Sequence, residues 1–141
     1  MAENSRAETL QLVEGHCYAL QVVPAPRDHA FAHKAIRHDF AIVRTSRLTV
    51  LGSLTFDDFP DFRQAISFYL ETVSLGDNAH PLGTAFVDDE NAQITVVLDA
   101  ASLAAIAETM RIGIDVSFRL TGLAVAQERL EIVEFCYDYE F

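Results

Sequence analysis

Alternation of apolar and polar residues is the feature that most constrains the fold of this chain. It runs without a fault over Ile112–Leu120, and it recurs in His16–Val23, Arg47–Phe56 and Arg129–Phe141. Successive side chains of a β-strand point to opposite faces, so each of these segments has one apolar and one polar face. Such strands are typical of an antiparallel sheet with one buried face and one face in water.

Two other segments show the spacing of three and four residues that is typical of an amphipathic helix. The first would begin at a cap formed by Asp57 or Asp58, with Pro60 in its first turn. Its apolar stripe consists of Phe59, Phe62, Ile66, Tyr69, Leu70 and Val73. Phe68 falls off that stripe. The second helix would begin after a cap at Asp99, and its stripe consists of Leu103, Ile106, Ala107 and Met110.

The remaining segments complete the predicted order of elements. Pro24 and Pro26 end the first strand, because proline donates no hydrogen bond to a ladder, and a loop or short helix follows through His38. Thr84–Val87 and Gln93–Leu98 form a hairpin around a polar turn. We therefore predict a single α+β domain over residues 1–141, with the order ββαββαββ. About six mostly antiparallel strands would carry two helices packed on one face.

Two details of this prediction concern short segments. At the N-terminus, Ser5–Glu8 fits the capping box of a short helix that ends at Gly15, but Thr9–Val13 equally fits a strand. Near the C-terminus, Thr121 and Gly122 are expected to turn the chain between the last two strands.

Net charge limits the classes of partner. The 141 residues carry a formal charge of −11, whereas nucleic-acid-binding proteins need a basic footprint, so we expect no direct binding of nucleic acid. No apolar run approaches the roughly 20 residues of a membrane-spanning helix. The first 14 residues alternate in polarity and contain glutamates, unlike a signal peptide. We expect a soluble, cytoplasmic protein without a membrane partner and without a cofactor.

The charge is distributed unevenly along the chain. Residues 1–50 hold five acids and six bases, whereas residues 51–141 hold sixteen acids and four bases. Arg27–Arg47 is the one basic stretch, and it also contains three of the five histidines. Asymmetry of this kind bears on association with other molecules.

The histidines of the basic stretch are candidate metal ligands. His29 and His33 are four residues apart, which on a helix places two imidazoles on one side, as in zinc-binding helices. His38 is the third candidate, and Asp28 or Asp39 could add a carboxylate. The alternative interpretation is a polar loop with solvated histidines, because Ala30 stands where zinc proteases carry a glutamate.

The two cysteines give little indication of catalysis. His16 precedes Cys17, but adjacent residues of a strand point to opposite faces, so the imidazole is poorly placed to activate that thiol. We expect Cys17 and Cys136 to be small residues in the core or at its rim. No disulfide follows from the sequence, although the two could lie on neighbouring strands.

Four carboxylates form the candidate binding surface. Glu134, Asp138 and Glu140 share one face of the last predicted strand, and Asp115 is expected on the same side of the sheet. We call these four residues the acidic face. Solubility alone also explains such a row. The functional interpretation is a surface whose like-charge repulsion is relieved when it binds a basic partner.

These features favour a non-catalytic binding protein that engages a basic protein partner through its acidic face. In size and charge the chain is similar to small acidic inhibitors and immunity proteins, an analogy that implies occupation of an enzyme's phosphate-binding site. One alternative is self-association, in which the basic stretch of one copy meets the acidic sheet of another, or the C-terminal strand, rich in Tyr and Phe, pairs across a two-fold axis. Another is a small metal-dependent or ligand-binding enzyme that uses His29, His33 and His38.

Overall fold

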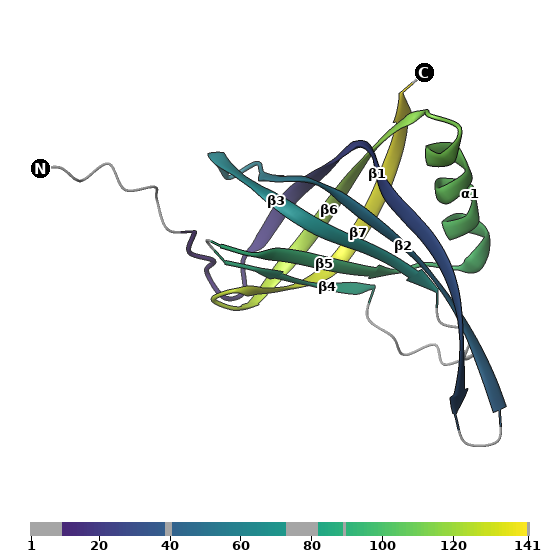
Figure 1. Cartoon of the computed structure of the whole chain (residues 1–141). Helices are drawn as coiled ribbons and strands as arrows, with labels where there is room; N and C mark the ends of the chain where they lie inside the picture. The colour runs from purple at the N-terminus through teal and green to yellow at the C-terminus, as the bar shows by residue number, and fades with distance from the viewer. Residues whose placement is uncertain (1–9, 39–40, 73–81, 89, 141) are drawn as a thin grey trace, which may run out of the picture.

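Within the described residues, seven strands form a closed barrel, and one helix packs against it (Figure 1). The structure is a computed structural model that describes residues 10–38, 41–72, 82–88 and 90–140, without the side chains of 34, 36–38, 41–44 and 140. The elements are β1 (Cys17–His38), β2 (Ala41–Phe56), β3 (Phe59–Thr72), β4 (Gly83–Val87), β5 (Ala92–Val97), α1 (Ala100–Arg111), β6 (Asp115–Ala126) and β7 (Arg129–Glu140).

The order of strands around the barrel is β1-β2-β3-β5-β4-β7-β6. Neighbouring strands are antiparallel except β3 and β5, which pair in parallel from Ser67–Gln93 to Glu71–Val97. The barrel closes where β1 pairs with β6, from Cys17–Leu123 to Val22–Phe118. Closure leaves no free sheet edge along that part of the wall.

The hydrophobic core fills the inside of the barrel. Alternate residues of each strand point inward, and the largest fully buried side chains include Phe56, Phe68 and Phe118. The rings of Phe68 and Phe118 lie with their centroids 4.9 Å apart, so strands β3 and β6 meet across the interior. The polar residues between them point outward, which is why the strands alternate in the sequence.

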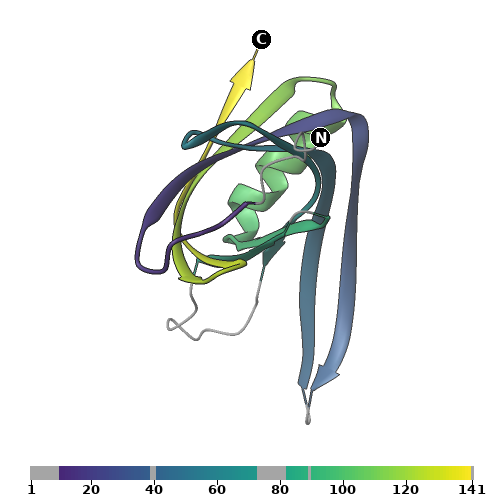
Figure 2. The same cartoon turned by 90° about the vertical axis from the view of Figure 1, so that its left-hand side faces the viewer.

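Two segments cover the ends of the barrel. Helix α1 begins at its N-cap Asp99, and it buries Leu103, Ile106, Ala107 and Met110. At the other end, residues 10–16 cross the barrel near its β6–β7 turn (Figure 2). Leu10 and Leu12 are buried there, and the Gly15 amide donates to the Ala124 carbonyl oxygen over 2.7 Å. These residues form neither a helix nor a strand.

The prediction of an α+β fold with two helices on one face of a sheet is wrong, because the first predicted helix is strand β3. Its inward positions include Ile66, Phe68 and Leu70, which alternate with exposed or half-buried residues. Phe68 is fully buried, although it falls off the helical stripe, whereas Tyr69 faces outward. The apolar residues of this segment therefore fit the two-residue period of a strand as well as the period of a helix. The segment forms a strand because it pairs with β2 and β5.

The predicted end of the first strand at Pro24 and Pro26 is also wrong. Strand β1 continues to His38 through an irregularity between Pro24 and His29, where Arg27 has a φ of 65°. Prolines are tolerated at such a bulge, because the ladder is interrupted there. The predicted turn at Thr121 and Gly122 lies instead inside β6, which continues to Ala126.

Other expectations are confirmed. The hairpin of β4 and β5 turns where the Asp88 carboxylate accepts hydrogen bonds from the amides of Glu90 and Asn91, at 2.7 and 2.6 Å. Asp99 caps α1, and its predicted apolar stripe is the buried one. The last strand begins at Arg129 as predicted. The capping box at Ser5–Glu8 lies outside the described residues.

Beyond the barrel, β1 and β2 continue as a two-stranded ribbon (Figures 1 and 2). The last described pair between β2 and β3 is Ser46–Thr72, and β6 leaves β1 at Val22. We call Lys34–His38 of β1 and Ala41–Arg44 of β2 the arm. Among the described residues, the helix is too short to cross a membrane.

Candidate functional site

The acidic face lies on the outer wall of the barrel, across β6 and β7. Asp115, Glu134 and Asp138 are all exposed. In the register of these antiparallel strands, Asp115 is opposite Glu140, Asp138 is opposite Ser117, and Glu134 is opposite Thr121. The structure therefore brings these four positions onto one pair of strands, although it does not describe the Glu140 side chain.

A bulge in β7 places these carboxylates on the outside. Gly122 pairs with Ile132, but the preceding residue Thr121 pairs with Glu134, so Val133 is an extra residue in β7. Ile132 is buried, and strict alternation from it would point Glu134 inward. The extra residue reverses the alternation, so Glu134 and Asp138 face water. Val133 itself is 45% exposed, which contradicts its predicted place on the apolar face.

The exposed carboxylates of the acidic face have no salt bridge within the described part of the chain. The ion pairs found there lie elsewhere: His16 with Asp58, Arg47 with Glu71, and Arg111 with Glu108. Like charges on neighbouring positions of a sheet repel one another. A cationic partner would therefore bring opposite charge to the exposed carboxylates of this face.

One cation, Arg119, stands in the middle of this surface, and it pairs across the strands with Cys136. The acidic-face hypothesis did not include Arg119 among its binding residues, but the signal is present, because Arg119 alternates with Asp115 on the polar side of β6. Its guanidinium and the neighbouring carboxylates make the surface a mixture of charges with an acidic excess, rather than a uniform patch.

A shallow depression of about 300 Å³ adjoins Arg119 on the outer wall over β1, β6 and β7. Its lining includes the side chains of Gln21, Asp57, Glu134 and Cys136. Arg119 belongs to the lining as well, so the depression combines a guanidinium with carboxylates and can receive a polar side chain. Asp57, predicted as a helix cap, instead lies in the β2–β3 turn and borders this depression.

Both cysteines are exposed on the outside of the barrel, so the expectation that they lie in the core or at its rim is wrong. They are not on neighbouring strands either, because β6 lies between β1 and β7. Cys17 is opposite Leu123, whereas Cys136 is opposite Arg119. Both are free thiols.

The histidine candidates lie on strand β1 and not on a helix. His29 and His33 are four residues apart, which in a strand separates them by about 13 Å, too far to share one ion. His33 Nδ1 lies 2.6 Å from Ser46 Oγ, and the His29 Nδ1 atom is buried without a described hydrogen-bond partner. The side chain of His38 lies outside the description. The described residues contain no metal-binding group of three acidic, histidine or cysteine side chains.

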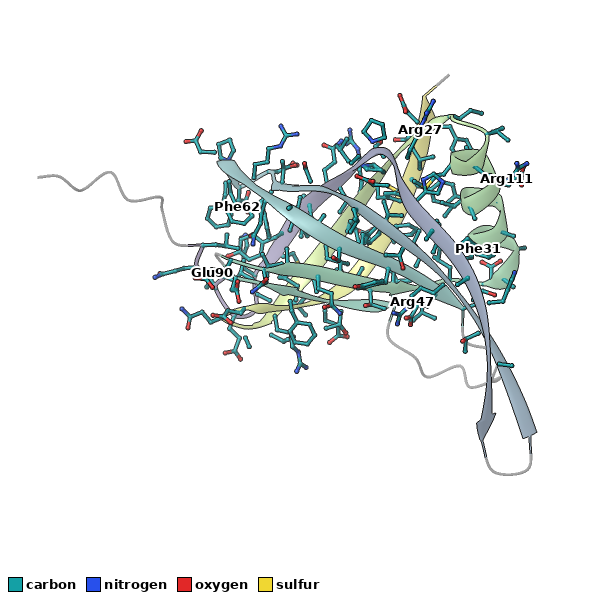
Figure 3. The ribbon with its side chains drawn as sticks, viewed as in Figure 1. Arg27, Phe31, Arg47, Phe62, Glu90 and Arg111 are labelled. Carbon is teal, nitrogen blue, oxygen red and sulfur yellow. The ribbon has the colours of Figure 1, made fainter. Side chains whose placement is uncertain are left out.

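Phe31 lies between these two histidines in the sequence, and its ring meets His33 edge to face, with centroids 4.8 Å apart. Figure 3 shows Phe31 on strand β1. The surroundings of His33 are therefore a hydroxyl and an aromatic ring, which suit a packed, hydrogen-bonded imidazole better than a metal ligand.

Side chains behind the acidic face show one titration shift. Tyr137 and Tyr139 lie on the other side of β7 from Asp138, and a hydrogen bond with Tyr139 raises the pKa of Tyr137, with burial as a further cause. The two phenol rings have centroids 5.5 Å apart. On the helix, hydrogen bonds from Ser102 lower the pKa of Asp99, and a hydrogen bond from Arg111 lowers the pKa of Glu108.

Comparison of this chain with protein-family models, curated proteins and solved structures gave no match. Its function is therefore argued from the geometry of the barrel, the acidic face and the arm. Of these, the acidic face is a group of exposed charges whose side chains, except that of Glu140, the structure describes.

Proposed function

We propose that this protein acts by binding another protein through its acidic face, and that the partner is basic where it docks. The observation that carries the proposal is the exposure of Asp115, Glu134 and Asp138 on one outer wall without a salt bridge among the described residues. A cationic surface relieves their repulsion and is steered toward them during association.

Apolar side chains at the border of the acidic face support a protein partner over a small ion. Val133, next to Glu134 in β7, is exposed to 45%. Phe86 of β4, exposed to 53%, lies further away, opposite Arg129 at the start of β7. Protein interfaces combine aromatic or aliphatic anchors with a polar surround. The nearby depression at Arg119 adds a recess for one partner side chain.

The test uses a variant in which the described carboxylates of the face are neutralised: Asp115→Asn, Glu134→Gln and Asp138→Asn. Wild type and variant are immobilised, exposed to extract from the natural source, and the retained proteins are identified by mass spectrometry. We expect at least one protein that is basic where it docks to bind wild type and to be lost from the variant. Its affinity should fall at least about tenfold between roughly 50 and 300 mM salt.

A matched control carries the same change in net charge elsewhere: Glu14→Gln, Asp61→Asn and Glu90→Gln, all at exposed positions. This control should retain the partner as wild type does, because its substitutions leave the acidic face intact. Retention of the same proteins by all three forms, or binding that ignores salt, would contradict the proposal.

A further inference from the structure

The arm has no strand partner beyond its own two strands in the part of the chain that the structure describes. Its strands pair with each other, from Ala35–Arg44 to His38–Ala41, and no third described strand pairs with them. Each edge of such a ribbon presents unpaired backbone groups. An isolated two-stranded ribbon is at best marginally stable in water.

The composition of the arm indicates what would cover it. Its nine residues include three bases and no acid, and three of the others are the β-branched apolar residues Ile36, Ile42 and Val43. The bases are Lys34, Arg37 and Arg44. A surface that accepts this ribbon should therefore be acidic, with some apolar area, since charge complementarity selects the partner and apolar burial adds affinity.

The arm does not reach the acidic face of its own chain. In both views it projects from the barrel on the side away from the end of β7 (Figures 1 and 2). Asp115 of β6 pairs with Glu140 at that far end of β7. Asp138 and Glu134 precede Glu140 on the same strand. The acidic face of one chain therefore does not cover the arm of that same chain, whereas the acidic face of a second chain can.

We propose that the arm of one copy docks on the acidic face of a second copy. This inference rests on the proposed function, because it uses the same face, and it names a second copy of this chain as the basic partner. Each chain carries one arm and one face, which are complementary in charge. Mutual exchange of arms gives a two-fold dimer, and one-way docking gives a ring or a filament, so both assemblies contain the same contact.

Cys136 provides a direct test of the contact, because this exposed thiol stands between Glu134 and Asp138 on the outer face of β7. The experiment combines Cys17→Ser, which removes the other thiol, with Ala35→Cys, which adds one in the arm. Under mild oxidation at low salt, we expect disulfide-linked pairs of chains between positions 35 and 136, identified by mass spectrometry. High salt should suppress them.

The matched control is Ala65→Cys in the same Cys17→Ser background. Ala65 is exposed on the outer wall of β3, away from the arm. Linkage between 35 and 136 that does not exceed linkage between 65 and 136 would overturn the inference. Because Ala35 is exposed and lies outside the barrel, its substitution leaves the core intact.

Charge reversal gives an independent second test. Arg37→Glu with Arg44→Glu reverses the arm, and Glu134→Lys with Asp138→Lys reverses the face. In sedimentation velocity at low salt, we expect wild type to associate and each reversed form to sediment as smaller species. A mixture of the two reversed forms should associate, because each arm then meets a face of opposite charge on the other form, and a chain carrying all four substitutions should recover association for the same reason.

The two proposals fail in different ways. If wild type stays monomeric at low salt while the face-neutralised variant still loses a basic protein from the extract, the second-copy inference is wrong and the proposed function stands. If wild type is monomeric and neutralising the face changes no binding, both are wrong. Association that is as strong in the arm-reversed form alone and in the face-reversed form alone as in wild type would also overturn the docking of the arm.

Discussion

At the scale of single residues, Val133 determines which side of β7 carries the carboxylates. It is the extra residue opposite the Thr121–Gly122 step, and it separates inward-facing Ile132 from outward-facing Glu134. The alternation of Glu134, Cys136 and Asp138 in the sequence predicts correctly that they share a face. It cannot reveal the bulge, because Val133 is apolar and fits the apolar row equally well.

Phe68 and Tyr69 provide a residue-level test of the fold. Phe68→Ala should lower the free energy of unfolding by about 3–5 kcal/mol, because its fully buried ring packs on Phe118. Tyr69→Ala should cost about 1 kcal/mol, since its ring faces outward under the Arg47 guanidinium, at 4.7 Å. Urea denaturation measures both. A helix in this segment would give the reverse order, with Tyr69 the costlier position.

Tyr137 should make the stability of the protein sensitive to alkaline pH. The hydrogen bond with Tyr139 raises its pKa above the usual value of 10.0, so the folded state keeps the phenol proton longer than the unfolded chain does. The stability from this bond is present below pH 10 and is lost as the pH rises through the raised pKa. Between neutral and alkaline pH, the melting temperature should therefore fall more steeply for wild type than for Tyr137→Phe. Parallel curves would contradict this assignment.

At the scale of elements, local spacing predicts those segments whose partners are close in the chain. The β4–β5 hairpin and α1 follow from turn residues, a cap and a stripe that are contiguous in the sequence. Strand β3 cannot be predicted in this way, because it pairs in parallel with β5, which lies beyond a long connection in the sequence. There the apolar residues fit both periods, and only the tertiary partner decides between them.

The bend of β1 over β2 depends on Gly52, whose missing side chain admits the neighbouring backbone. A Cβ at this position would lie 2.3 Å from the Val23 carbonyl oxygen and 2.8 Å from the Pro24 Cα. Gly52→Ala should lower the free energy of unfolding by about 3 kcal/mol or more, because backbone must move to admit the methyl group. Ser53→Ala, at the next and half-buried position, is the matched control and should change it by less than about 1 kcal/mol. Equal effects in chemical denaturation would show that β1 does not pass so close.

At the scale of the whole molecule, the uneven charge of the sequence becomes a separation in space. The described residues of the basic stretch Arg27–Arg47 belong to strands β1 and β2, although the sequence predicts a loop or short helix through His38. This stretch includes the arm, whereas most of the acids lie on the barrel. The charge asymmetry could therefore be found from the sequence, but the protruding ribbon could not. The closure of the barrel could not be predicted either, because it pairs β1 with β6, for example Cys17 with Leu123, which are far apart in the sequence.

The central claim is that the arm of a second copy covers the acidic face, and carboxylate labelling of the purified wild-type protein tests it most directly. A carbodiimide and an amine modify exposed carboxylates at rates that mass spectrometry resolves residue by residue. At low salt, concentrating the protein should slow modification of Glu134 and Asp138 several-fold, while Asp61 and Glu90 keep their rates, and high salt should remove the difference. Rates at Glu134 and Asp138 that are independent of both protein concentration and salt would contradict the claim.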